Sequence, residues 1–482
     1  MDHALRLALL LLLFAKVYPS SSAYEFEHCK NTVKQWASSS LHSNIKDGHI
    51  LKDLLFFLHV PRTGGRTYFY CFLKKLYSSS LECPRSYDKL RFDPRKQNCR
   101  LLATHDDYSI MSKLPRERTS VVTILRNPID RVFSAYEFSI EVAARFLIHP
   151  NLTSATKMSG NLRSKNGVIS TLDIWPWKYL VPWMREELFA KRDARKRKGP
   201  PYAYGDDSYN MEEIATPLHE FINHPVTLDL VHNGATFQIA GLTNNSNTWK
   251  VHEVRHCVMS YQSLGKYVVE VAKKRLDDML YVGLTEDHKQ SATMFANFVG
   301  AQVISQLAAS NPGTETVNYN KSEQGSVFSK AGSSTSHDQG NNTSMVKEQT
   351  ENMTVGKLME TYETCVSKLR STQSKRRITS LKRIFPANFT KEARKHVPEA
   401  VLKQIILLNS LDVELYKHAH IIFERQHQAM EKKLLHSAMS VMNGKNYIPS
   451  AWEFVYLFVF IFLAFFIFLY VNAKRRILKL KI

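Results

Sequence analysis

The amino-acid sequence predicts an α/β fold with a central parallel sheet, a C-terminal helical segment and one transmembrane helix. Two apolar runs, residues 54–60 and 119–125, have the length of strands, and a helix-like segment follows each of them. This alternation is typical of parallel sheets, whose strands need crossover connections. Helical periodicity returns over much of residues 355–449, and an unbroken apolar and aromatic run covers positions 454–471.

The composition indicates a folded and strongly basic protein. Hydrophobic residues make up 44% of the 482 positions, which excludes a wholly disordered chain. The formal net charge is +21, and about +15 of it remains when the two ends of the chain are set aside. A basic body attracts polyanions, so the partner is expected among nucleic acids, acidic polysaccharides, acidic peptides and nucleotides.

The two ends of the chain predict a secretory, membrane-anchored protein. Residues 1–23 have the pattern of a cleaved signal peptide that ends before Tyr24, with an uncleaved anchor as the alternative. Near the other end, Trp452 and a basic cluster flank the apolar run, and the positive-inside rule leaves the preceding chain in the lumen. The predicted parts are a lumenal domain at 24–299, a polar, glycosylated and disordered insertion at 300–354, a helical part at 355–449, a transmembrane helix at 452–471 and a cytosolic tail at 472–482.

Sequons and cysteines agree with a lumenal location. The asparagines that stand two positions before Ser or Thr, with no proline between, are Asn151, Asn244, Asn320, Asn341, Asn342, Asn352 and Asn388. Six cysteines in an oxidising compartment allow several complete pairings. Cys83 and Cys99 bracket a short turn-rich segment and are predicted to form a bridge, whereas Cys71 is predicted to remain a buried free thiol.

A first anion-binding motif follows the apolar run 54–60, which ends in a Gly-Gly turn and enters an amphipathic stretch. Backbone N–H groups and the positive end of a helix converge at such a turn, which suits a phosphate group. The spacing and the lysine of a Walker A loop are absent. An ordinary strand–turn–helix junction fits the same pattern when it is taken alone. The residues predicted to bind an anionic cofactor are His59, Val60, Pro61, Arg62, Thr63, Gly64, Gly65, Arg66 and Thr67.

A second motif follows the apolar run 119–125. Arg126 stands at the carboxyl end of the predicted strand, where its guanidinium could contact a phosphate through two hydrogen bonds. Pro128 suits the first turn of a helix, and Ser134 lies about two turns further on, within reach of the same group. A helix start with ordinary surface arginines is the alternative.

Together the two motifs are similar to the pair by which sulfotransferases that use 3′-phosphoadenosine 5′-phosphosulfate (PAPS) are recognised. The sequence resembles the heparan sulfate 6-O-sulfotransferase family, and the resemblance continues through residues 230–242, 280–286 and 407–425. It implies a P-loop-like sulfotransferase fold, with the 5′-phosphosulfate at the first motif and the 3′-phosphate at Arg126 and Ser134. The family usually has Lys where Arg62 stands, so the resemblance assigns the neutralisation of the bridging phosphate oxygen to Arg62.

His105 is the predicted catalytic base. It lies between the two motifs, in the segment 103–108, and the resemblance implies that a His here takes the proton of the acceptor. An imidazole is suited to this role because its ordinary pKa of about 6.5 keeps much of it neutral near neutral pH. The neighbouring Asp106 is expected to orient the ring. A surface histidine in a polar loop is the alternative.

A basic segment, residues 185–198, is the candidate acceptor-binding surface. The predicted substrate-binding residues are Arg185, Arg192 and Arg195, and a solvated helix face is the equally weighted alternative. No cluster of His, Cys, Asp and Glu has the spacing of a metal site, so no metal is expected. A nucleic-acid partner is not expected either.

The predicted topology decides between acceptors. A cleaved signal with a C-terminal anchor resembles a branch of the family, the plant tyrosylprotein sulfotransferases, and implies a type I protein of the Golgi membrane. The resemblance implies transfer to Tyr next to Asp in acidic secreted peptide or protein precursors. The alternatives are a glycan 6-O-sulfotransferase and, more remotely, an inactive polyanion-binding membrane protein.

Overall fold

A computed structural model describes most of the chain between residues 21 and 444. The described residues are 21–42, 50–83, 99–148, 186–197, 209–211, 215–244, 246, 249–309, 353–382, 384–385 and 389–444. Residues 1–20 of the predicted signal peptide at 1–23, the predicted transmembrane helix at 452–471 and the predicted tail lie outside this set. Within it, no helix is long and apolar enough to cross a membrane.

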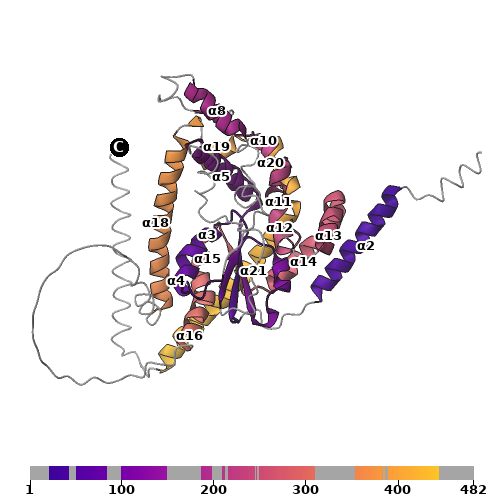
Figure 1. The fold of residues 1–482 in the computed structure, drawn as a ribbon. Coiled ribbons are helices and arrows are strands. Elements are labelled where there is room, and N and C mark those ends of the chain that lie inside the picture. Colours follow the sequence, from indigo (N-terminus) through magenta and orange to yellow (C-terminus); the bar gives the residue numbers. More distant parts are fainter. Residues whose placement is uncertain are drawn as a thin grey trace, which may run out of the picture. The chain divides into compact units, whose positions relative to one another are not determined.

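The centre of the fold is a four-stranded sheet in which every pair of neighbours is parallel, as the sequence predicts (Figure 1). The strand order is β2-β1-β3-β5. All residues of these strands are buried, which explains why their sequences are continuous apolar runs rather than alternating ones. The strands are β1 (Leu54–Leu58), β2 (Leu101–Thr104), β3 (Thr119–Leu125) and β5 (Tyr281–Leu284).

The strand order creates a reversal point beside β1. The chain leaves β1 to form β2 on one side and then crosses to form β3 on the other side. Leu58 is level with Thr104 on β2 and with Thr123 on β3, so the three strands end close to the same edge. In parallel α/β sheets, ligands bind at the carboxyl edge where the strand order reverses. The topology therefore predicts the site before any side chain is considered.

Helices lie on both sides of the sheet (Figure 1). One group follows β1 and β5 and comprises α3 (Gly65–Tyr68), a π-helical turn η1 (Phe69–Leu73), α4 (Lys74–Leu76), α15 (His288–Phe295), a second π-helical turn η9 (Ala296–Gly300) and α16 (Ala301–Ala309). The other group comprises α2 (Ser21–Leu41), α12 (Gly234–Ile239), α13 (Trp249–Ser260) and α14 (Gly265–Asp277). Helix α16 lies in the first part of the insertion that was predicted to be disordered. The prediction of disorder is therefore wrong for residues 301–309. The insertion from 310 to 352 lies outside the described residues.

A further set of elements surrounds α5, the long helix that follows β3. They are α5 (Pro128–Ile148), α8 (Glu186–Arg197), α10 (Leu218–Phe221), α11 (Leu228–Val231) and a two-residue strand pair, β4 (Tyr209–Asn210) with β6 (Ile384–Phe385). Apolar residues of α5 pack with those of α8, α10, α11 and the later helix α20 in one buried cluster. Short 3-10 turns are η3 (Tyr108–Ser112), η4 (Arg116–Arg118), η7 (Pro225–Thr227) and η8 (Gln262–Leu264).

The C-terminal part is helical, as the sequence predicts. It consists of α18 (Val355–Leu381), α19 (Lys391–Lys395), α20 (Glu399–Leu408) and α21 (Ser410–Gly444). The chain forms two compact units, residues 1–426 and 427–482, and α21 contributes to both. In the first unit, Asp412 is buried and accepts hydrogen bonds from Arg131 of α5 and from the Thr236 backbone of α12. The ion pair with Arg131 holds the start of α21 against α5, and the hydrogen bond from Thr236 N holds it against α12.

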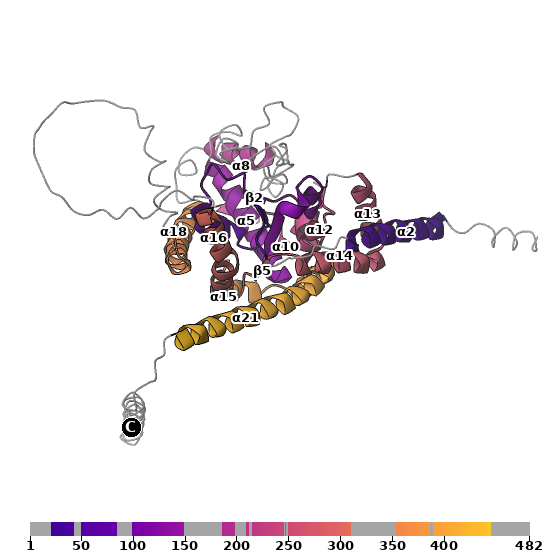
Figure 2. The same cartoon turned by 90° about the horizontal axis from the view of Figure 1, so that it is seen from below.

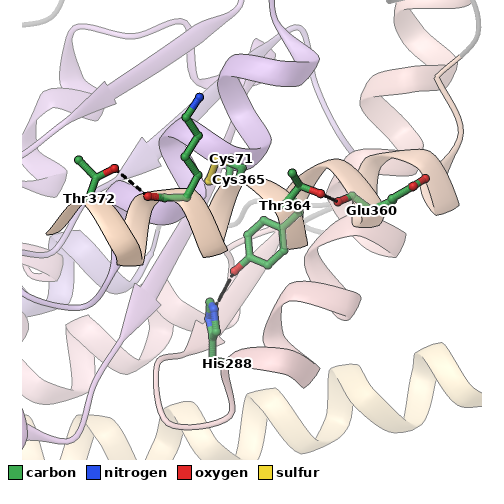
Figure 3. The surroundings of a disulfide bond; sticks show 8 residues. Cys71, His288, Glu360, Thr364, Cys365 and Thr372 are labelled. Carbon is green, nitrogen blue, oxygen red and sulfur yellow. Dashed lines mark hydrogen bonds between the residues drawn. A yellow bond between two sulfur atoms is a disulfide. The ribbon is translucent and has the colours of Figure 1, made fainter. Parts of the chain in front are cut away.

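The first unit contains three disulfides, two of which link parts that are distant in sequence. Cys83 pairs with Cys99, as predicted, and Cys29 of α2 pairs with Cys257 of α13. Figures 1 and 2 show α2 beside α13 and α14. The prediction of a free thiol at Cys71 is wrong, because α18 packs on η1 and brings Cys365 to a Cα–Cα distance of 5.5 Å (Figure 3).

Candidate active site

The two predicted cofactor motifs meet at the carboxyl edge of the sheet. Arg62, four residues after β1, donates hydrogen bonds from Nη2 and Nε to Ser134 Oγ of α5, at 2.9 and 3.2 Å. Its guanidinium also lies over the ring of Phe138, 4.3 Å from the centroid. Residues that are 72 positions apart in sequence thus form one polar contact beside the reversal point of the sheet.

The loop between β1 and α3 has a backbone that only certain residues adopt easily. Arg62 and Gly64 have left-handed φ angles of 68° and 79°. At Gly65, an added Cβ would lie 2.3 Å from the ring of His59, so the helix start can approach that ring only without a side chain. Thr63 is buried and its hydroxyl donates to Val60 O at 2.8 Å. The tight turn that the sequence predicts is therefore shaped by Arg62, by Thr63 and by the Gly-Gly pair.

Arg126 lies immediately after β3 and points toward the same loop. Its Nη1 donates to Arg62 O at 3.3 Å, and burial lowers the pKa of its guanidinium. The Nε atom is buried and has no hydrogen-bond partner among the described residues; the nearest acidic oxygen, Glu286 Oε1, is 4.0 Å away. A buried cationic donor without a partner fits a bound anion, because a phosphate oxygen would supply the missing acceptor.

Glu286 organises the neighbouring backbone and was not singled out from the sequence as a site residue. Its carboxylate accepts from Asn127 N at 2.9 Å and from the Tyr416 hydroxyl at 2.7 Å. The preceding Thr285 donates to Thr63 O at 2.7 Å and to Leu125 O at 2.9 Å. These two residues follow β5, so the end of that strand is hydrogen-bonded to both predicted cofactor motifs.

His105 follows β2 and is held against the first motif. Its Nδ1 is 2.8 Å from His59 O, and the two imidazole rings are 4.2 Å apart. Because a carbonyl oxygen only accepts, Nδ1 carries the proton and the lone pair of the neutral ring is on Nε2. That is the tautomer a general base requires at Nε2.

The carboxylates beside His105 have other partners. Asp106 accepts the hydroxyl proton of Thr104 at 2.8 Å, so the His59 carbonyl rather than the expected Asp106 orients the His105 ring. Asp107 caps the following turn through Ser109 N at 3.0 Å and accepts from Thr243 N at 2.9 Å. Both carboxylates are buried and serve the loop that carries His105.

Gln238 of α12 joins these loops and was missed by sequence reasoning. Its Nε2 donates to the carbonyl oxygens of His59, His105 and Asp106 at 3.2, 3.0 and 3.1 Å. Three carbonyl acceptors surround this one atom, and the amide oxygen cannot donate to them. The atom is therefore the amide nitrogen, which fixes the orientation of the side-chain amide. The side chain is 3% exposed, so one buried amide holds the ends of β1 and β2 together. Its position in the 230–242 segment was the available signal.

Comparison with known proteins places this arrangement in a family. A protein-tyrosine sulfotransferase of Arabidopsis thaliana is 56% identical over 494 aligned positions, which cover 99% of this chain and 98% of the relative. The chain belongs to the protein-tyrosine sulfotransferase family. It is therefore a sulfotransferase, and the shared carboxyl edge of its strands is the candidate active site. No protein-family model matches the sequence.

The predicted acceptor residues of the sulfotransferase lie on α8, apart from Arg185, which is outside the described residues. Arg192 is 6% exposed and its Nε donates to Asp193 at 2.9 Å. Arg195 lies over the ring of Tyr209, 3.9 Å from the centroid. Both arginines thus make contacts within the protein, and their acceptor role stays a prediction.

Two other predictions concern the surface and metals. Among the sequon asparagines, the structure describes Asn244, which is exposed and donates to Asp229 at 2.7 Å. The other six sequon asparagines lie outside the described residues. Groups of three or more His, Cys, Asp and Glu that could hold a metal ion are absent from the described part of the chain. The expectation of a reaction without a metal stays a prediction.

Proposed function

We propose that this sulfotransferase transfers a sulfuryl group from PAPS to the hydroxyl of tyrosine residues next to aspartate in secreted peptide or protein precursors. The observation that carries the proposal is the meeting of Arg62, Ser134 and Arg126 at the edge of the sheet where the strand order reverses, with His105 bonded to His59 O of the loop that carries Arg62. The relative named protein-tyrosine sulfotransferase supports the tyrosine acceptor.

The donor would bind with its phosphates against the two motifs. PAPS supplies the sulfuryl group, which leaves the 5′-phosphate as the tyrosine oxygen forms its bond to sulfur. Arg126, with its buried Nε lacking a hydrogen-bond partner in the described chain, and Ser134 would hold the 3′-phosphate. Arg62 would exchange its contact with Ser134 for one to the phosphosulfate and neutralise the charge that develops on the leaving oxygen.

His105 would remove the proton of the tyrosine hydroxyl. A phenol has a pKa of about 10, so a neutral imidazole at hydrogen-bond distance assists its deprotonation as the oxygen attacks. The bond from Nδ1 to His59 O supports this role, because it leaves the lone pair on Nε2. Replacement of His105 by Ala is expected to lower turnover at least about a hundredfold.

The proposed location is the Golgi membrane, with type I topology and a lumenal catalytic domain. The apolar segments near both ends of the sequence support it, as do the three disulfides, which form in oxidising compartments. Fusion of a fluorescent protein after residue 482 of the full chain, combined with selective permeabilisation, would report on which side the C-terminus lies. Protection of a lumenal epitope with a cytosolic C-terminus is the expected result.

The proposed reaction is tested by a direct comparison of acceptors. The full-length enzyme in detergent receives ³⁵S-labelled PAPS and equal concentrations of an Asp-Tyr peptide, its Ala-Tyr variant and N-sulfated heparan chains. We expect label in the Asp-Tyr peptide. The Ala-Tyr variant should have a higher KM, because it loses an exposed ion pair that contributes about 0.2–1 kcal/mol. Label in the glycan alone would overturn the proposal in favour of a glycan 6-O-sulfotransferase.

A further inference from the structure

The second half of α18 carries a basic segment, largely exposed, that the reaction described above does not use. Residues 368–382 contain no acidic side chain. The basic residues there are Lys368, Arg370, Lys375, Arg376, Arg377 and Lys382. We propose that this basic segment of α18 binds the acidic residues that flank the acceptor tyrosine in the substrate peptide; the inference rests on the proposed function and extends it.

The basic segment bridges two anchored ends of its helix. Before it, Val366 is buried and Cys365 is bonded to Cys71 of η1 (Figure 3). Near the end of the segment, Ser380 is buried and Arg377 donates to Glu137 of α5 at 3.4 Å. Between these anchors, every residue from 370 to 376 is exposed, so about two turns of helix are open to solvent around their whole circumference. A helix that is polar all round needs a reason other than core packing.

Both anchors belong to elements that carry the proposed donor site. Cys71 lies one and a half turns after Gly65, in the helical stretch that starts at the phosphosulfate loop. Glu137 lies one turn after Ser134 on α5. The basic segment therefore belongs to a helix that contacts both η1, which follows the first motif, and α5, which follows the second.

The charges of the basic segment are available for a partner. Lys368, Lys375 and Arg376 make no ion pair and no side-chain hydrogen bond with other residues that the structure describes, and all three are exposed. The arginines of α8 differ in this respect, because Arg192 and Arg195 contact side chains of their own domain. A cluster of unpaired positive charges raises the local concentration of an anionic partner, and salt weakens this attraction.

The length of the segment defines the partner. Fourteen helical steps from Lys368 to Lys382 span about 21 Å, which an extended peptide covers with about six residues. The occupant is therefore an acidic stretch of about six residues beside the acceptor tyrosine. A single Asp next to the tyrosine would lie at the active site and could not reach the whole segment.

The test combines a charge-reversed enzyme with two peptides. The variant Lys375→Glu/Arg376→Glu is compared with wild type and with the control Lys34→Glu/Lys266→Glu, which makes the same change of net charge on α2 and α14. One peptide has Asp-Tyr with six acidic flanking residues, and the second keeps Asp-Tyr but has Asn and Gln in the flank. Full-length enzymes are used, and thermal melts confirm that each is folded.

For the acidic peptide, we expect the KM of the α18 variant to rise about tenfold while kcat is unchanged. For the neutral-flank peptide, all three enzymes should agree within about twofold, and the control should match wild type with both peptides. The inference is wrong if the α18 variant keeps the wild-type KM for the acidic peptide, or if both peptides lose equally. If wild type sulfates neither peptide, the proposed function itself fails, which is a different outcome.

Discussion

Gln238 illustrates how a single buried side chain can set the geometry of the active site. Its amide donates to the backbone of both loops that carry the histidines, and one of its acceptors, His59 O, is also the acceptor of His105 Nδ1. The amide thus fixes the position of the carbonyl that selects the tautomer of His105. In the proposed reaction Gln238 is a positioning residue, because it would act only through the loops it holds.

Replacement of Gln238 by Leu should therefore reduce turnover without reducing donor affinity. Small displacements of a base lower rates strongly, so we expect kcat to fall on the order of ten- to a hundredfold, with PAPS affinity within about twofold of wild type. The matched control is Gln302→Leu, which removes a glutamine that bonds Leu51 and Phe298 near the other end of β1. Steady-state kinetics and calorimetry on both variants provide the comparison. Equal loss of kcat in the two would show that Gln238 only stabilises the fold.

Several site residues were predictable from the sequence, and others were not. Arg62, Arg126 and Ser134 follow apolar strands, so the pattern places them at the carboxyl edge, and the structure brings all three together. Gln238 lies in α12 and Glu286 lies just after β5, and neither segment's sequence contains a phosphate-binding signal. Their roles depend on which loops approach them in three dimensions, which one sequence does not reveal.

At the scale of elements, α18 shows what the sequence leaves undetermined. Its helical periodicity is visible, but the segment of the chain against which it packs is not. The helix contacts η1 and α5, and aromatic packing fixes it there: Tyr362 stacks on Phe72 with 4.0 Å between ring centroids, and its hydroxyl is 3.1 Å from His288 Nε2. Cys71 and Cys365 meet for the same reason, although 294 positions separate them.

The long-range disulfide should therefore stabilise the fold more than the local one. A bridge constrains the unfolded chain more strongly when the closed loop is longer, and the two loops here span 294 and 16 positions. We expect Cys71→Ala/Cys365→Ala to lower the free energy of unfolding by about 2 kcal/mol more than Cys83→Ala/Cys99→Ala. Urea unfolding followed by circular dichroism compares the two variants. Indistinguishable midpoints would contradict this explanation of the role of the bridge.

At the scale of the whole molecule, we propose two separate uses for the basic charge. Inside the sheet edge, Arg62 and Arg126 are partly buried and face the proposed donor. On the surface, the basic segment of α18 faces solvent. The total charge predicted a polyanionic partner, but it could not divide these roles, because composition carries no information about burial. The parallel sheet, in contrast, was predictable from the sequence, because strands that are buried on both faces of a sheet are continuous apolar runs.

The central claim is that the carboxyl edge between β1 and β3 binds PAPS. Calorimetric titration of PAPS into wild type, Arg126→Ala and His105→Ala tests it most directly. We predict that Arg126→Ala weakens binding by about 2–3 kcal/mol, roughly 30- to 150-fold, because a buried charge-assisted contact is lost. His105→Ala, which removes the proposed base and no proposed phosphate contact, should bind as wild type does. Unchanged PAPS affinity in a folded Arg126→Ala enzyme would contradict the assignment of the site.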